Sequence, residues 1–473
     1  MTAVNTGSQD ASAIVIRGGV VVNATEGRPA TVVVDGGRIT GVLAPDWQLP
    51  AGGPSVRVID AQGCFVLPGG VDPHVHVATS LGEYRTADGH AEASVAALAG
   101  GTTTIVDFAI PDDGVTPLEA ADERIRLSAE ARCSVVLHGC VTQTFSGDVE
   151  AELAGLVERG IRSVKVFTTY RDAFMATDDQ IFAVLAGMRD AQGLTYVHAE
   201  WDPLVFSLQT EFKARDQAAS AEHHVMRPAP VEVVAVRQVL TVAEALAAPV
   251  YFVHLSTPES VADVGAARGR GRRAYAETCP HYLLLTDEAY RSASGPEFLC
   301  CPPLRARDVV SALMDSVQEG RIDAIGSDHC CFTREQKYRH ADVRQAPFGL
   351  PGVETRLPLM IDELAVQRSV PWTRVVDMLC ATPARLNGVY PQKGVIAAGS
   401  DADIVIIDPG RNKRPLRGSD LHMRTDIEPY AGHEPVAFPL WVISGGRIAV
   451  DDGVFTDPGP GPGYLPSGAI LPW

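Results

Sequence analysis

The sequence lacks a long apolar run and any excess of positive charge. No stretch stays apolar for the ~20 residues that a membrane-spanning helix needs. The opening residues contain neither a basic segment followed by an apolar one nor another secretion-signal pattern. The net charge is −18, whereas chains that bind nucleic acid by bulk attraction carry clustered Lys and Arg. We therefore expect no membrane or nucleic-acid partner and a cytoplasmic location.

Cysteine spacing of the kind found in disulfide frameworks is also missing. Nine is an odd number of cysteines, and two pairs are directly adjacent, Cys300–Cys301 and Cys330–Cys331. This favours reduced thiols packed as small core side chains. Internal repeats are absent too, and 473 residues are enough for a large core and a second domain.

Both ends of the chain contain short β-branched runs separated by turn residues. Examples are Thr31–Asp35 near the start and Ile404–Ile407 near the end. Runs of this kind are typical of sheet. We predict that residues 1–66 and 386–473, the latter including a Pro- and Gly-rich tail, together form one β domain.

Residues 67–385 alternate strand-like apolar runs with amphipathic segments of helical length. This alternation predicts parallel strands joined by crossover helices, and eight such units predict an α/β fold of the (β/α)8 TIM-like barrel type. In that fold the chemistry gathers at the carboxyl ends of the strands. The runs end near His76, Ala109, Val141, Tyr170, Glu200, Ser256, Pro280 and His329.

Five of the predicted strand ends carry side chains able to bind metal ions. His74 and His76 are two residues apart, so on a strand both point to the same side. A single histidine is more often an ordinary core residue, but several on one rim of a barrel indicate a metal site. The candidates are His74, His76, Lys165, His198, His254 and Asp328.

Lys165 is the unusual member of this set. An ammonium is repelled by neighbouring cations, and its burial inside a barrel is costly. One interpretation is a lysine paired with a carboxylate. A second interpretation comes from a family resemblance.

The motifs DPHVH, SVKVF, VHAE, VHLS and GSDH resemble those of the amidohydrolase superfamily, specifically its dihydropyrimidinase and hydantoinase branch. The resemblance extends over nearly the whole chain, including KGVIAAGSDADIVIID near the end. It implies that the terminal segments form a small β-sandwich domain beside the barrel. It also implies a homotetramer.

The resemblance implies a binuclear metal centre. His74 and His76 would bind one ion together with Asp328, and His198 and His254 would bind the other. Lys165, having combined with carbon dioxide to give N6-carboxylysine, would bridge the two ions together with a hydroxide. These donors favour Zn²⁺ and also permit Mn²⁺, Fe²⁺ or Co²⁺. Asp328 would act as general base and then general acid.

The substrate positions implied by the resemblance are Tyr170, Cys301 and Phe348. A tyrosine five residues after the lysine stabilises the oxyanion in this branch. Cys301 stands where hydantoinases have a serine, and Phe348 where they have an asparagine, at positions that hold the ring through backbone groups. His281 in ETCPHYLLL instead resembles allantoinases. The charged residues Glu83 and Arg85 suggest a polar ring substituent.

The predicted function is hydrolysis of a cyclic amide or imide, of hydantoin or dihydropyrimidine type, to an N-carbamoyl amino acid. The partner is then a small cyclic ureide or imide. An allantoinase-like or dihydroorotase-like hydrolase of another cyclic ureide is the alternative. A non-catalytic scaffold, as in paralogues that have lost metal ligands, is a third hypothesis that the complete ligand set disfavours.

Overall fold

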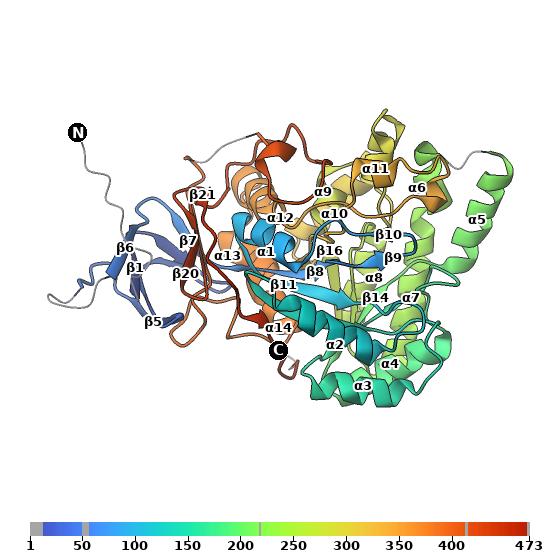
Figure 1. Ribbon diagram of the computed structural model, residues 1–473, viewed down its shortest axis with the longest axis horizontal. Helices are drawn as coiled ribbons and strands as arrows, with labels where there is room; N and C mark the ends of the chain where they lie inside the picture. The colour runs from blue at the N-terminus through green and yellow to red at the C-terminus, as the bar shows by residue number, and fades with distance from the viewer. Residues whose placement is uncertain (1–12, 50–55, 217–218, 412–414, 471–473) are drawn as a thin grey trace.

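Eight parallel strands form the wall of a barrel in the middle of the chain (Figure 1). This computed structural model describes residues 13–49, 56–216, 219–411 and 415–470. Neighbouring strands pair in chain order, and a bridge between Val75 and His329 brings the last strand back to the first. The predicted TIM-like barrel is thereby confirmed. Its strands are β8 (Gly70–Val75), β11 (Thr102–Ala109), β12 (Ser134–Cys140), β13 (Ser163–Phe167), β14 (Leu194–His198), β15 (Val250–Phe252), β16 (Ala274–Thr278) and β17 (Ala324–Ile325).

Helices cover the outside of the barrel (Figure 1). Several begin at a threonine whose hydroxyl accepts a backbone N–H of the first turn, as Thr116 and Thr177 do. Such caps satisfy N–H groups that have no partner within the helix. The main covering helices are α1 (His90–Ala99), α2 (Pro117–Ser128), α3 (Val149–Glu158), α4 (Asp178–Asp190), α7 (Ala229–Leu246), α8 (Pro258–Gly269) and α10 (Arg307–Gln318).

Further helices lie in the connections. Those of α type are α5 (Asp202–Ala214), α6 (His223–Met226), α9 (Pro280–Leu284), α11 (Arg334–Lys337), α12 (Arg356–Met360), α13 (Trp372–Val376) and α14 (Thr382–Leu386). Wider turns are η5 (Ile361–Gln367) and η6 (Asp377–Ala381). Tighter turns are η1 (Ser220–Glu222), η2 (Asp287–Arg291), η3 (Gly295–Phe298), η4 (Val343–Gln345) and η7 (Gly418–Asp420). No helix in these described ranges is long and apolar enough to cross a membrane.

The two ends of the chain build a pair of sheets beside the barrel (Figure 1). The sheet orders are β5-β4-β1-β6 and β21-β20-β19-β18-β7-β2-β3. Ile14 and Val32 from the start share one buried cluster with Ile404 and Ile443 from the end. The predicted β-sandwich is confirmed, while the domain limits 1–66, 67–385 and 386–473 remain a proposal. Its strands are β1 (Ala13–Arg17), β2 (Val20–Val22), β3 (Gly27–Pro29), β4 (Thr31–Asp35), β5 (Arg38–Leu43), β6 (Val56–Asp60), β7 (Phe65–Pro68), β18 (Ile404–Ile407), β19 (Trp441–Ser444), β20 (Arg447–Asp451) and β21 (Val454–Phe455).

Two further short elements attach to the barrel. Strands β9 (Ser80–Leu81) and β10 (Tyr84–Arg85) form a hairpin after the first barrel strand. The tail returns as β22 (Gly463–Tyr464), which pairs with β12.

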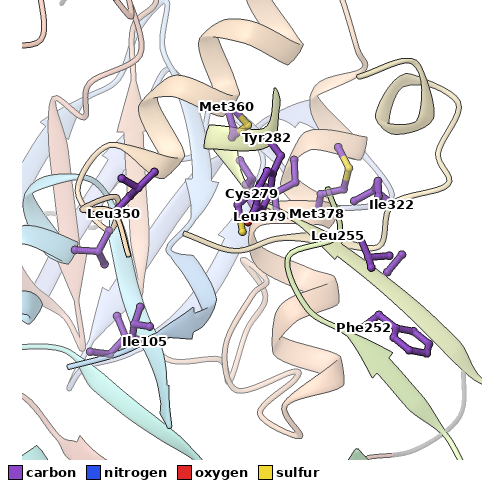
Figure 2. Close-up of a cluster of buried hydrophobic side chains, with 14 of the residues drawn as sticks. Ile105, Phe252, Leu255, Cys279, Tyr282, Ile322, Leu350, Met360, Met378 and Leu379 are labelled. Atoms are coloured by element: carbon purple, nitrogen blue, oxygen red, sulfur yellow. The ribbon is translucent and has the colours of Figure 1, made fainter. Parts of the chain in front are cut away.

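The main core lies between the barrel wall and its helices. Figure 2 shows barrel side chains such as Ile105 and Phe252 together with Met378 and Leu379 of η6. Tyr196 and Tyr251 stack at 4.3 Å between ring centroids in a separate cluster. All nine cysteines are buried and unpaired, which confirms the prediction of reduced thiols in the core.

Candidate metal centre

The predicted site residues meet at the carboxyl ends of the barrel strands. A cavity of about 360 Å³ opens there. Eight of the nine predicted residues line it, and His74, which is fully buried, lies against them. The eight are His76, Lys165, Tyr170, His198, His254, Cys301, Asp328 and Phe348.

The first group of donors consists of His74, His76 and Asp328. His74 Nε2 is 3.3 Å from His76 Nε2 and 3.1 Å from Asp328 Oδ1. His76 Nε2 is 3.5 Å from the same carboxylate oxygen. Three donor atoms therefore converge on one point.

The second group is formed by His198 and His254. His198 Nδ1 lies 2.9 Å from His254 Nε2. The two groups are neighbours, because the donor atoms of His74, His254 and Asp328 all lie within 4.8 Å of one another. This is the compact arrangement that two adjacent ions would require.

Lys165 is fully buried between these groups, and its amine has no hydrogen-bond partner within the described chain. Its Nζ atom is 4.7 Å from the ring centre of Phe108 and 5.0 Å from that of Phe167. The first interpretation of Lys165, a direct pair with a carboxylate, does not match this environment. Burial lowers the pKa of the amine to about 8.

Burial favours the neutral form of the four histidines. Burial lowers the pKa of each imidazole, and that of His76 falls to about 3. The positive charge of Lys165 lowers the pKa of all four further. A neutral imidazole keeps a lone pair, which metal binding needs.

Two buried carboxylates turn these lone pairs inward. Glu277 Oε1 is 2.8 Å from His74 Nδ1, and Glu200 Oε2 is 2.9 Å from His198 Nε2. Each carboxylate accepts the ring N–H, so the opposite nitrogen of the ring presents its lone pair to the centre. The donor set, its geometry and the unpartnered lysine amine therefore fit a pair of divalent ions.

Glu200 and Glu277 were missed as functional residues in the sequence. The VHAE motif contained a signal for Glu200, because it follows His198 by two residues and so points the same way. Glu277 is 203 residues from His74, and nothing in the local sequence links them.

Three site residues have left-handed backbone. The φ angles are 72° at Tyr170, 41° at His254 and 48° at Asp328. Non-glycine residues rarely adopt this conformation, and those that do cluster at functional sites. All three lie just beyond a barrel strand, where the reversed backbone redirects the side chain into the cavity.

Tyr170, Cys301 and Phe348, the predicted substrate positions, all line the cavity. Burial raises the pKa of Tyr170 well above its ordinary value, so its hydroxyl stays protonated and can donate. Phe348 stacks on His223 at 4.9 Å between ring centroids. Arg227 lies over the Tyr170 ring and pairs with Glu200 at 2.5 Å.

A second group of possible metal donors is Asp88, His329 and Cys331, whose polar atoms already form hydrogen bonds within the protein. His329 Nδ1 accepts the Gly352 N–H at 3.1 Å, so its Nε2 carries the proton and faces Asp88 at 3.1 Å. Asp88 also accepts the Arg424 N–H. Neither ring nitrogen of His329 is left to bind a metal.

The family model that matches this chain is the amidohydrolase family, over residues 65–448. The chain belongs to the amidohydrolase family. The match spans the whole barrel and the sandwich strands β7, β18 and β19, and it begins after strands β1 to β6.

Several relatives place the chain in the hydantoinase and dihydropyrimidinase branch, as predicted. It is 35% identical to a D-hydantoinase of Ralstonia pickettii, covering 93% of this chain and 96% of the relative. Identity to a D-phenylhydantoinase of Escherichia coli is 33%, covering 94% and 95%. The crystal structure of a dihydropyrimidinase from Brevibacillus agri superposes with a TM-score of 0.92 at 31% identity, covering 97% of this chain and all of that one.

Proposed function

We propose that this amidohydrolase opens a hydantoin or dihydropyrimidine ring by hydrolysis and releases an N-carbamoyl amino acid. The observation that carries the proposal is the pair of inward-facing donor groups around one buried, unpartnered lysine. The names of the curated relatives, D-hydantoinase and D-phenylhydantoinase, agree with an enzyme that acts on carbon–nitrogen bonds of cyclic amides.

The proposed cofactors are two divalent ions, Zn²⁺ in the first place, with Mn²⁺, Fe²⁺ or Co²⁺ also compatible with the donors. His74, His76 and Asp328 would hold one, and His198 and His254 the other. When bound, the ions would supply a hydroxide near neutral pH and polarise the scissile carbonyl.

Lys165 is proposed to carry a carbamate. Its nitrogen would attack the carbon of carbon dioxide and lose a proton, which gives an anion with two oxygen donors. The complete burial of the amine supports this proposal, since desolvation favours the neutral amine that reacts.

Asp328 and Tyr170 would act on the substrate. Asp328 would accept the proton lost at attack and return it to the departing ring nitrogen, because its carboxylate lies beside both histidines of the first group. The Tyr170 hydroxyl would donate to the oxyanion that develops on the attacked carbonyl.

The substituent on the ring is proposed to be apolar. Leu81, Tyr84, Ile110, Phe174 and Phe348 line the cavity. Of the two charged residues that suggested a polar substituent, Arg85 is not among the residues that line the cavity. Glu83 lines it, but its carboxylate pairs with Arg339 at 3.2 Å and with His340 at 3.0 Å.

An allantoinase-like or dihydroorotase-like activity is the alternative proposal, and His281 is the residue that favours it. This side chain is buried, is not among the residues that line the cavity and has no hydrogen-bond partner within the described ranges. A non-catalytic scaffold would not require the complete set of donors found here.

A hydrolysis panel tests the proposal. Hydantoin, 5-phenylhydantoin, dihydrouracil, allantoin and dihydroorotate are offered to protein of measured metal content. We expect turnover of the first three and about two ions per chain. Turnover of allantoin or dihydroorotate alone would establish the alternative, and no turnover by metal-loaded protein would favour the scaffold.

A cytoplasmic homotetramer completes the proposal. Phe182 of α4, Phe206 of α5 and Val242 of α7 are 53%, 49% and 37% exposed. Large apolar side chains at the surface favour contact with another copy. Light scattering after gel filtration gives the number of chains directly.

A further inference from the structure

Lys337 is a buried lysine outside the metal centre. It ends the short helix α11 and is only 1% exposed. Its ammonium donates to three backbone carbonyls, those of Leu299 at 2.8 Å, Pro347 at 2.9 Å and Gly349 at 2.7 Å. One side chain thus uses all of its donors on main-chain oxygens.

The three carbonyls belong to two separate walls of the cavity. Leu299 precedes Cys300 and Cys301, whereas Pro347 and Gly349 flank Phe348. Cys301, Pro347, Phe348 and Gly349 all line the cavity. The Gly349 N–H also donates to the Leu299 carbonyl at 2.9 Å, so Lys337 sits where the two walls join.

The contacts of Lys337 determine which way the peptide groups of the second wall face. The Pro347–Phe348 peptide is trans, so its N–H points away from its carbonyl. Because that carbonyl faces Lys337, the Phe348 N–H faces the opposite side. No group in the described ranges accepts it, and Phe348 is only half-buried, so this N–H takes its partner from outside the chain, from water or a ligand. A ring carbonyl in the cavity would be such a partner.

Lys337 differs from Lys393, another buried lysine outside the metal centre. Lys393 Nζ forms ion pairs with Asp401 at 3.0 Å and Asp403 at 2.7 Å. Lys337 forms no ion pair within the described ranges, and burial lowers its pKa to about 8. Its charge is compensated by the three carbonyls and by the ring of Phe332, whose centre lies 5.6 Å from Nζ. Burial of a charge without a counter-ion destabilises the fold.

We propose that Lys337 is a positioning residue for substrate: it locks the Leu299–Cys301 and Pro347–Gly349 segments so that the Phe348 amide faces the ring in the cavity. The inference rests on the proposed function for the identity of the ring. It adds a residue whose side chain points away from the substrate and acts only through the main chain.

Lys337→Met tests the proposal, because its unbranched side chain is shorter by only the terminal atom and removes all three donors. We expect KM for hydantoin and dihydrouracil to rise about tenfold to a hundredfold, as for loss of hydrogen bonds from a charged group. The metal content should stay at the wild-type value and kcat should change much less than KM. Lys337→Gln keeps two N–H donors, so its KM should lie between those of wild type and Lys337→Met. It is the variant to measure if Lys337→Met does not fold.

Lys393→Met is the matched control. It also removes a buried ammonium and should lower the melting temperature, but KM should stay within twofold of wild type. This separates positioning of the cavity wall from general loss of stability.

Hydrogen exchange of the substrate-free protein gives a readout that does not depend on turnover. Backbone amides of residues 299–301 and 348–350 should exchange faster in Lys337→Met than in Lys393→Met. Unchanged exchange, unchanged KM, or loss of metal together with affinity would each overturn the proposal. If the wild-type protein opens no ring, the proposed function fails, while the exchange comparison still decides whether Lys337 locks the wall.

Discussion

Single residues in this site owe their chemistry to what surrounds them. Asp328 is a carboxylate like 57 other acidic residues in the chain, which has 58 Asp and Glu in all. What sets it apart is its place in the barrel, where Oδ1 lies within 3.5 Å of two imidazole nitrogens. Position, more than residue type, makes it the candidate for proton transfer.

Asp328→Asn should keep the fold and lower kcat by about 10² to 10⁴, because an amide of the same shape cannot accept and return a proton. Steady-state kinetics with the best ring of the panel measures the loss, and circular dichroism checks the fold. Wild-type turnover in this variant would remove Asp328 from proton transfer.

Tyr170→Phe should lower kcat by about 10² to 10³ and change KM little, since a donor aimed at the oxyanion acts in the transition state. Tyr464→Phe is the control, because Tyr464 also donates a hydrogen bond, to the Arg159 carbonyl at 2.7 Å, far from the cavity. If kcat is equal in the two variants, Tyr170 contributes to packing and does not stabilise the oxyanion.

Lys165→Ala should lose metal and activity together, because it removes the proposed bridging anion. A short-chain carboxylic acid in the buffer should restore part of both. Carbon-13 NMR of wild-type protein with labelled bicarbonate reports the carbamate itself. An unmodified amine in an active protein with two ions per chain would contradict the carbamate.

At the scale of elements, the loops after the strands decide the shape of the cavity. The loop that follows β17 contains Gly349, whose φ is 147°. A Cβ atom there would lie 2.4 Å from the Cys330 carbonyl oxygen. This is a backbone atom, so no side-chain rotation can relieve the clash. The path of this loop past Phe348 therefore depends on glycine.

Gly349→Ala should cost about 1 to 3 kcal/mol of stability and also reduce substrate affinity, because the loop must shift. Gly320→Ala is the control: Gly320 also has a positive φ, 77°, but a Cβ atom there meets nothing within 4 Å. It should cost about 1 to 2 kcal/mol with KM unchanged. Thermal unfolding and kinetics measure both effects, and wild-type KM in Gly349→Ala would show that the loop accommodates the methyl group.

At the scale of the whole molecule, ions bound at the candidate metal centre would contribute to global stability. The donors come from β8, β13, β14 and the segments after β15 and β17, so bound ions would link strands from all around the ring. A ligand that binds only the folded state stabilises it by mass action.

Removal of metal by a chelator should therefore abolish turnover and lower the melting temperature, and added Zn²⁺ should restore both. Calorimetry before and after dialysis against the chelator makes the comparison. An unchanged melting temperature in protein shown to have lost its ions would mean that the five segments are held by protein contacts alone.

The sequence by itself determined the barrel, the sandwich and the candidate donors. Burial on both faces makes barrel strands continuous β-branched runs, and ligands at their ends keep local spacings such as that of His74 and His76. Only the tertiary structure decided how these donors are oriented. Glu277 reaches His74, and Lys337 reaches Leu299 and Gly349, across contacts between distant segments. The left-handed turns at His254 and Asp328 likewise depend on packing, because local preference disfavours them. Local patterns report on backbone periodicity, whereas hydrogen bonds between distant segments exist only once the chain has closed into the barrel.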